Sequence, residues 1–599
     1  MTETIISRRD LDFMLFEWLD VGSLVGRKRF AEHSVATFKD VLALSEQIAT
    51  EHFAPHNRKG DLEEPRLVAG EVHVLPEIEP ALRAYADAGL IGATMDSSVG
   101  GFQLPQSVFN GCTAWFYAAN MSTAAYNLLT IGNANLLLAH GTPEQVATFV
   151  VPMVEGRYFG TMALSEPQAG SSLADITTRA EPQPDGTYRL FGTKMWISGA
   201  DHQMGENIVH LVLAKAPGGG PGAKGISLFI VPKFLVNPDG TLGEHNDVAV
   251  AGLNHKMGAR ATVNTVFALG DGTHSPAGRP GAVGYLVGEE HQGLAYMFHM
   301  MNEARVGVGL SAVSLGYTSY LKSLAYAKSR PQGRPVGERN PDRPQVPLIE
   351  HADVRRMLLT QKSYAEGALA LVLYCGWLLD EHKTATDLEA RARAATLLGL
   401  LTPIAKSWPA QWCLRANELA IQVHGGYGYT RDYDVEQHYR DNRLNPIHEG
   451  THGIQALDLL NRKVLGDGAE GLRMLAGLVG ESASRAQKSP LPELRAMGDA
   501  LAGDWDRLLR TTESLRAVPD VAARLANASV YLEATGHLVI AWMWLDQALV
   551  AASGTDPFHR GKLAAASHFF LHELPHARVQ LDLLAANHSP ALCMRPDEF

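Results

Sequence analysis

The hydrophobic pattern of this chain changes its period twice along its 599 residues, and each change limits the folds available to it. Residues 1 to about 160 carry apolar side chains at the three- and four-residue spacing of amphipathic helices, as in 36–44. From about 161 to 290 the pattern shifts to short β-type runs such as 208–213, separated by turns rich in Gly and Pro. Helical spacing returns from 291 onward. We therefore expect an α+β multidomain protein in which a β-domain separates two helical regions.

The second helical region divides further. The stretch 331–347 contains five prolines with charges of both signs, which predicts an exposed loop within a helical hairpin. Beyond about residue 470, helical spacing in 491–509, 530–551 and 562–584 predicts a small additional bundle. The predicted domains are an N-terminal helical domain (1–160), a middle β-domain (161–290), a helical domain (291–468) and an extra C-terminal helical domain (469–599).

Composition argues against several classes of protein. Hydrophobic residues make up 46% and charged residues 19% of the chain, as in a globular protein that buries several cores. The net charge of −12 argues against a nucleic acid or an anionic membrane surface as the main partner. The four cysteines form no CxxC pair, the histidines are dispersed, and no apolar run is long enough to span a bilayer. Acidic residues near the N-terminus argue against a secretory signal. We expect a cytoplasmic protein with no metal site and no membrane span.

Glu449 is the strongest candidate for a catalytic side chain. It follows the helix-ending Asn445-Pro446 and precedes Gly450 and Thr451, so it is predicted to lie on a loop. The glycine lets the backbone approach a ligand, and the threonine offers a hydroxyl beside the carboxylate. A lone glutamate on a loop is usually a solvated charge. Three other polar stretches of the chain favour the functional interpretation.

Each of those stretches offers groups that suit a planar ring or a phosphate, although each is commonplace alone. The loop 163–172 is rich in hydroxyl and backbone N–H donors, which suit a flavin's pyrimidine edge or a phosphate. In 192–199, Trp196 is able to stack on a planar ring, and Ser198 to bond a ring nitrogen. In 422–429, paired glycines permit the close approach of a diphosphate.

Together and in this order, the four stretches resemble the acyl-CoA dehydrogenase family over roughly residues 30–465. Further segments match the family's pattern: Ala86–Pro105, His255–Arg260, Leu286–Glu290, and Arg305 followed by Gly307. The resemblance implies a helical N-terminal domain, a middle β-domain and a C-terminal four-helix domain, followed here by the extra helical bundle. This longer architecture resembles a large bacterial subgroup that includes 3-methylthiopropanoyl-CoA dehydrogenases and broad-range fatty acyl-CoA dehydrogenases.

The resemblance also implies a chemistry. Glu449 would be the base that removes the α-proton of an acyl-CoA thioester, and the β-hydrogen would leave as hydride to N5 of bound FAD, giving the trans-2-enoyl-CoA. The electrons would then pass to electron-transfer flavoprotein. The residues expected to bind FAD are Met162, Leu164, Ser165, Gly170, Ser171, Trp196, Ile197, Ser198, Arg330, Gln422, Gly425, Gly426, Thr451, His452 and Gly453. Those expected to face the acyl-CoA are Ser171, Asn302, Arg305 and Gly450.

Some members of the family carry the base on the long helix, one residue before the arginine that matches Arg305. That position is Ala304 in this chain, which has no carboxylate. Glu303 lies one step away and points about 100° around the helix. Glu449 therefore remains the predicted base.

Three positions depart from the family's pattern. The usual Asp after Gly-Ser is Ser172, and the segment that begins at Arg330 is shortened. The residue before the base, commonly aromatic, is His448. Either His448 fills the volume of the aromatic ring as a polar wall residue, or its charge tunes the pKa of Glu449 or polarises a heteroatom in a short acyl chain.

Three functions stay open at this point. The first is an acyl-CoA dehydrogenase that passes electrons to electron-transfer flavoprotein, and the second is an acyl-CoA oxidase that uses O₂. The third is a flavoprotein relative that binds nucleic acid, which the acidic balance of this chain disfavours. The sequence does not indicate the acyl chain. A homodimer is favoured if the C-terminal bundle covers the surface that relatives use to form tetramers.

Overall fold

The computed structural model describes residues 5–466 and 468–599. The first four residues of the predicted N-terminal domain and residue 467 of the predicted 291–468 domain therefore lie outside the described residues. The chain forms two compact units. The helical unit contains the residues up to Leu42, Pro105–Ala118 and Arg305–Phe599, and the β unit contains Ala43–Leu104 and Ala119–Ala304.

The β unit is built on an eight-stranded sheet with the strand order β10-β11-β5-β12-β7-β6-β3, in which β4 pairs with β5 and β6. The strands are β3 (Tyr158–Ala163), β4 (Arg179–Pro182), β5 (Tyr188–Ser198), β6 (Asn207–Lys215), β7 (Ile226–Pro232), β10 (Val248–Leu253), β11 (Asn264–Leu269) and β12 (Ala282–Leu286). Two small ribbons accompany it: β1 (Arg66–Val68) with β2 (Glu71–His73), and β8 (Phe234–Val236) with β9 (Leu242–His245).

Strand β6, which lies between β7 and β3, explains why this part of the sequence is so apolar. Val209, Leu211 and Leu213 belong to one hydrophobic cluster, whereas the alternating Val212 and Ala214 belong to another. Successive side chains of a strand point to opposite faces, so both faces of β6 are covered. A strand buried on both faces shows a continuous apolar run in the sequence.

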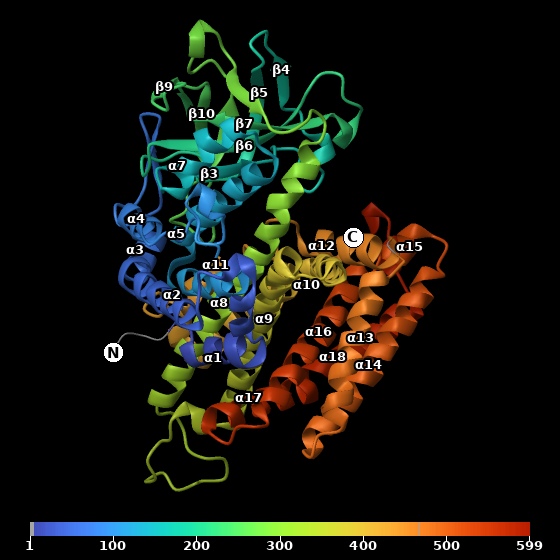
Figure 1. Ribbon diagram of the computed structural model, residues 1–599. Coiled ribbons are helices and arrows are strands. Elements are labelled where there is room, and N and C mark those ends of the chain that lie inside the picture. Colours follow the sequence, from blue (N-terminus) through green and yellow to red (C-terminus); the bar gives the residue numbers. More distant parts are fainter. Residues whose placement is uncertain (1–4, 467) are drawn as a thin grey trace. The chain divides into compact units, whose positions relative to one another are not determined.

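Helices make up most of the remaining chain (Figure 1). The first part contains α1 (Arg8–Asp12), α2 (Val35–Ile48), α3 (Asn57–Leu62), α4 (Ile78–Asp87), α5 (Gln106–His140), α6 (Pro143–Gln145) and α7 (Val151–Val154). The later part contains α8 (Gly293–Ser329), α9 (Ala352–Thr384), α10 (Leu388–His424), α11 (Val435–Asn442) and α12 (His452–Leu457). The chain passes between the units inside α2, just before α5, inside α5 and inside α8. The predicted proline-rich loop joins α8 to α9 and is mostly exposed, with a bridge between Pro331 and Pro347 at its base.

The C-terminal segment forms the predicted helical bundle. Its helices are α13 (Glu470–Gln487), α14 (Pro492–Arg516), α15 (Val521–Leu525), α16 (Ala528–Ala551), α17 (Pro557–His568) and α18 (Leu574–Ala586). Figure 1 shows α13, α14, α16 and α18 running alongside one another. The apolar α16 lies at the centre, because it packs on α14 and α18 and also on α9, α10 and α12. Across the described parts of the chain, no helix is both long and apolar enough to cross a membrane.

A buried charge cluster fastens this bundle to the rest of the helical unit. Lys562 on α17 is fully buried, and its Nζ forms ion pairs with Asp10 and, at 2.9 Å, with Oε2 of Glu366 on α9. Lys362 pairs with the same glutamate, and Tyr317 donates its hydroxyl to Asp10 Oδ2 at 2.9 Å. The N-terminal segment, α8, α9 and the bundle therefore share one network of hydrogen bonds.

We expect Lys562→Met to destabilise the protein by about 3–5 kcal/mol, because it leaves two buried carboxylates without their shared cation. Denaturant unfolding would measure the free energy of unfolding. Lys488→Met is the matched control, since Lys488 belongs to the same bundle but is exposed. Equal stability of the two variants would show that the cluster does not hold the bundle in place.

Candidate active site

Glu449 lies on the loop between α11 and α12, as the sequence predicted. Its φ of 52° is in the left-handed region, which is costly for a residue with a Cβ atom. Gly450 follows with a φ of 92°, and a Cβ atom there would come within 2.5 Å of Gln455 Nε2. A turn of this shape places a carboxylate in a fixed direction only if the surrounding structure holds it.

Lys406 on α10 is the side chain that holds the loop most directly. Its Nζ donates hydrogen bonds of 2.7 Å to the carbonyl oxygens of Asn445 and Gly450, on either side of Glu449. Gln455 Nε2 donates to the carbonyl oxygen of Glu449 itself at 3.0 Å. The side chain of Lys406 is 0% exposed, so these bonds do not compete with water. Lys406 is not among the residues predicted from the sequence, because a lysine within a long helix carries no sign of its backbone partners.

Burial and the charges around Glu449 act in opposite directions on its pKa. Burial raises the pKa of the Glu449 carboxyl above its usual range, while the positive charges of Lys406 and Arg305 lower it. Burial also lowers the pKa of Lys406 to about 7, an effect that Glu449 opposes and Arg305 adds to. Arg305 is buried and pairs with Asp458, with Nη1 3.0 Å from Oδ2. The predicted base and the predicted arginine thus interact electrostatically.

His448 does not carry the charge that one of the two hypotheses required. Burial, and then the nearby positive charge of Lys406, lower the pKa of His448 to about 3. The ring is therefore neutral at neutral pH. Its Nε2 lies 3.1 Å from Oδ1 of Asn445, which is consistent with the role of a polar wall residue.

Glu303, the carboxylate next to the alternative base position Ala304, is occupied by hydrogen bonds. Glu303 accepts hydrogen bonds from Asn135 Nδ2 at 2.8 and 3.0 Å within the β unit. Asn302, its neighbour on α8, is exposed, as is Ser171. The four residues predicted to face the acyl-CoA are therefore divided between the units: Asn302 and Ser171 belong to the β unit, and Arg305 and Gly450 to the helical unit.

In the β unit, the structure brings two of the predicted flavin-binding stretches together. Met162 and Leu164 lie at the end of β3, and the carbonyl oxygen of Ser165 accepts a hydrogen bond of 2.9 Å from the backbone N–H of Met195 on β5. Trp196 follows with a φ of 66° and is 60% exposed, so its large ring faces away from the core.

The two residues after Trp196 have different surroundings. Ser198 accepts a hydrogen bond of 3.0 Å from Asn264 Nδ2. Ile197 is 2% exposed because its side chain packs into the core of the sheet. The side chain of Ile197 is therefore not available to a ligand, which its place in the motif did not reveal.

An ion pair that sequence analysis missed fixes the polar loop after β3. Lys194 Nζ lies 3.0 Å from Oε1 of Glu166 and donates to the carbonyl oxygen of Leu164 at the same distance. Although burial raises the pKa of Glu166, the charge of Lys194 and hydrogen bonds from Thr177 and Thr178 lower it well below its usual range. Glu166 and Lys194 are both part of the selected stretches, but nothing in the sequence marked them as partners.

The glycine-rich stretch after α10 leaves room for a ligand. Gly425 has a φ of 62°, and no atom lies within 4 Å of a Cβ atom built on it or on Gly426. The guanidinium of Arg330 lies over the ring of Tyr427, 5.5 Å from its centroid. Gln422 is exposed at the end of α10. An open backbone, a cation and an exposed ring fit the diphosphate and adenine of a dinucleotide.

The predicted flavin-binding residues after the base begin α12. Thr451 caps the helix, and its hydroxyl accepts a hydrogen bond from the backbone N–H of Ile454. His452 Nδ1 lies 2.6 Å from Ser407 Oγ on α10. A Cβ atom on Gly453, as on Gly170 in the β unit, would meet no atom within 4 Å. Open space at these positions fits the flavin, whose binding residues were predicted there.

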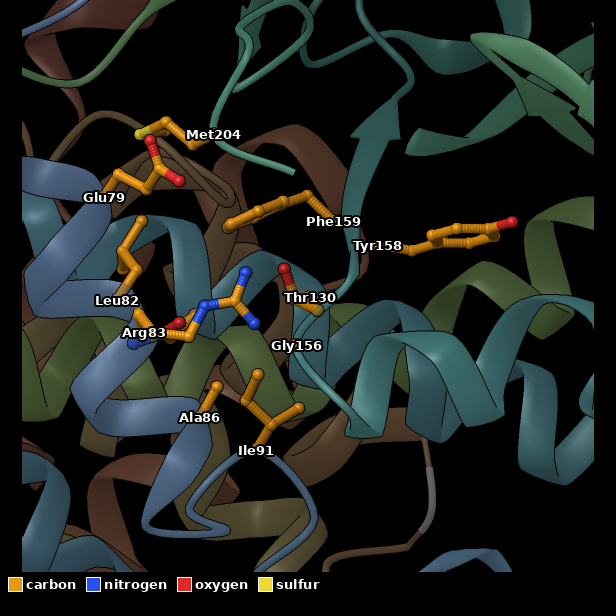
Figure 2. A pocket seen from close by; sticks show the side chains of 11 residues that line it. Glu79, Leu82, Arg83, Ala86, Ile91, Thr130, Gly156, Tyr158, Phe159 and Met204 are labelled. Carbon is orange, nitrogen blue, oxygen red and sulfur yellow. The ribbon is translucent and has the colours of Figure 1, made fainter. Parts of the chain in front are cut away.

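Two hollows lie apart from the predicted site residues. The first, between α4, α5 and β3, has a volume of about 10 Å³ and is lined by Arg83, Phe159 and their neighbours (Figure 2). That volume is roughly enough for one water molecule. The second is a cleft of about 540 Å³ between α9, α10 and α18, lined by residues such as Trp412, Arg415 and Gln580. Within the described residues, no group of His, Cys, Asp and Glu side chains is arranged to hold a metal ion.

Comparison with known proteins accounts for this arrangement. Family models match residues 161–294 (acyl-CoA dehydrogenase, middle domain), 291–464 (acyl-CoA dehydrogenase, C-terminal domain) and 475–595 (acetyl-CoA dehydrogenase C-terminal like). The chain is 37% identical to 3-methylmercaptopropionyl-CoA dehydrogenase of Ruegeria pomeroyi over 94% of both chains. It is 34% identical to the broad-specificity linear acyl-CoA dehydrogenase FadE5 of Mycobacterium tuberculosis over 95% of both.

A solved structure shows the same fold. Caenorhabditis elegans ACDH-11, in complex with C11-CoA, superposes with a TM-score of 0.75 at 18% identity, covering 96% of this chain and 93% of that one. The fold class, the family and the cofactor predicted from the sequence are confirmed. The chain belongs to the acyl-CoA dehydrogenase family of FAD-dependent oxidoreductases, with an additional C-terminal helical domain.

Proposed function

We propose that this protein dehydrogenates an acyl-CoA thioester to the trans-2-enoyl-CoA, with Glu449 as the base that removes the α-proton. The observation that carries the proposal is the environment of Glu449. Its carboxylate sits on a strained loop that Lys406 holds from both sides, and burial raises its pKa. A carboxylate that is fixed in direction and made more basic is suited to removing a weakly acidic proton.

The other residues act by binding and orientation. FAD, when bound, supplies the acceptor for the β-hydride. In the β unit, Trp196 and the loop after β3 would hold the flavin ring, and in the helical unit Arg330 and Gly425 would hold the diphosphate and adenine. Arg305, kept in place by Asp458, would attract the anionic acyl-CoA and also keep the pKa of Glu449 from rising further.

The electron acceptor, the oligomeric state and the cellular location are also proposals. We propose electron-transfer flavoprotein as the electron acceptor and a cytoplasmic homodimer as the working form, following the family resemblance. An oxidase would use the same base and flavin, and differs in the access of O₂ to the reduced flavin. A role in nucleic-acid binding is disfavoured by the net charge of −12.

The named relatives support an acyl-CoA substrate but differ in the acyl chain. The Ruegeria protein is named for a sulfur-containing chain and the mycobacterial protein for linear chains of broad length. We propose that the substrate is a saturated acyl-CoA. Titration of the flavin with acyl-CoAs of different length would show which acyl chain is preferred.

Anaerobic titration of the FAD-loaded protein tests the chemistry. We expect one or more acyl-CoAs, from propanoyl-CoA to hexadecanoyl-CoA and including 3-methylthiopropanoyl-CoA, to bleach the oxidised flavin. Glu449→Gln should slow bleaching by about 10²–10⁴-fold, because an amide cannot take the α-proton. The flavin spectrum of the variant before titration is the control for FAD binding. No bleaching of the wild-type flavin by any thioester would contradict the proposed activity.

The reduced protein distinguishes a dehydrogenase from an oxidase. After reduction with the best acyl-CoA, we expect electron-transfer flavoprotein to restore the oxidised flavin rapidly, and air-saturated buffer to do so far more slowly. Stopped-flow absorbance follows both reactions. Reoxidation by O₂ at the rate of turnover, with hydrogen peroxide formed, would identify an oxidase instead.

The pH dependence of flavin reduction tests the electrostatic role of Lys406. The base acts when unprotonated, so the rate falls as the pH falls through the pKa of Glu449, which burial places above the usual range of a glutamate. Lys406→Met removes a charge that lowers this pKa, so the acidic limb should move to higher pH. His448→Phe removes a neutral ring and should leave the limb unchanged. A limb that stays in place in Lys406→Met, or that moves in His448→Phe, would refute this account of the charges.

A further inference from the structure

An acidic side chain of the extra C-terminal domain lies beside the start of α12, next to the loop of the predicted base. Glu533 lies on α16, and its Oε1 is 3.4 Å from Nε2 of His452, the first residue of α12. The other ring nitrogen of His452, Nδ1, lies 2.6 Å from Ser407 Oγ on α10. The ring therefore makes a hydrogen bond with α10 through Nδ1, while Nε2 makes no hydrogen bond and has the Glu533 carboxylate of the extra domain beside it.

Close packing of α16 fixes Glu533 in this position. Glu533, Gly536 and His537 are three and four residues apart and share one face of the helix. A Cβ atom on Gly536 would come within 2.5 Å of Trp408 Cδ1, so only glycine permits this approach of α16 to α10. Trp408 Nε1 also donates to His537 Nδ1 at 3.3 Å. The face of α16 that carries Glu533 therefore packs closely against Trp408, the residue next to Ser407.

Glu533 has a second partner that orients its carboxylate. Gln580 Nε2 on α18 donates to Glu533 Oε2 at 2.7 Å, which leaves Oε1 for His452. The ring of His452 is only 15% exposed, so the oriented carboxylate lies against a mostly buried ring.

We propose that Glu533 is a positioning residue by which the C-terminal domain fixes His452, and with it the start of α12 and the adjoining loop of Glu449. His452 is three residues from Glu449, and Thr451, between them, caps the same helix. Loosening the histidine would loosen the turn that carries the base. The link to catalysis rests on the proposed function, whereas the link to the structure of the loop does not.

Hydrogen exchange in the full-length, FAD-loaded protein tests this inference without any acyl-CoA. Glu533→Ala should speed amide exchange in 447–457 by about threefold, because the start of α12 loses the side chain that packs against His452. Glu533→Gln should exchange at the wild-type rate, since a side chain of the same length and shape still packs against His452. Asp546→Ala is the matched control: it removes an acidic partner of Arg485 from the same helix, away from α12.

The outcomes are distinct. The inference is overturned if exchange in 447–457 is unchanged in Glu533→Ala, if Glu533→Gln fails to restore it, or if Asp546→Ala speeds it equally. Thermal unfolding of each variant checks that the domain stays folded. In the same variants, flavin reduction by the best acyl-CoA should be slowed by Glu533→Ala and restored by Glu533→Gln. If no acyl-CoA reduces the wild-type flavin, the proposed function fails while the exchange result still decides the role of Glu533.

Discussion

The arrangement of the predicted base depends on one buried ammonium group that bonds backbone rather than side chains. By donating to the carbonyl oxygens of Asn445 and Gly450, Lys406 closes the loop around Glu449 and stabilises a left-handed residue that would otherwise be unfavourable. Because α10 is long and buried over much of its length, the lysine has little freedom to move. The loop takes its rigidity from the helix beneath it, and any ligand bound there meets a carboxylate already in place.

The C-terminal domain is attached to the rest of the helical unit by apolar packing. Its central helix α16 is apolar on all sides, so it requires neighbours around its whole circumference. The bundle provides α14 and α18, and the rest of the helical unit provides α9, α10 and α12. The bundle is therefore an integral part of the helical unit, and Lys562 adds a buried ionic link to that apolar contact. A domain attached in this way is able to contribute side chains to the loop of the predicted base.

Much of this structure was predictable from the sequence, because the spacing of apolar residues along the chain indicates which side chains are buried. The short β-type run at 208–213 and the helical spacing in 530–551 correspond to β6 and α16. Motif chemistry likewise placed Glu449 on a loop. The sequence contains no sign of which residues far apart along the chain form hydrogen bonds with one another. Lys406 bonds carbonyl groups 39 and 44 residues away, which leave no side-chain signature. Ile197 shows a second limit of prediction from motifs. Its place in the motif does not reveal on which face of the strand its side chain lies.

The same burial acts on the base and on the group that holds it, and this couples them. Loss of water raises the pKa of Glu449 and lowers the pKa of Lys406 to about 7, since each charged form is disfavoured. Each charge in turn stabilises the other. A neutral lysine would still have two N–H groups for its two carbonyl partners, so the loop would keep its shape while the carboxylate became more basic. Lys406 therefore acts on both the position and the basicity of Glu449, through two separable interactions: hydrogen bonding and charge.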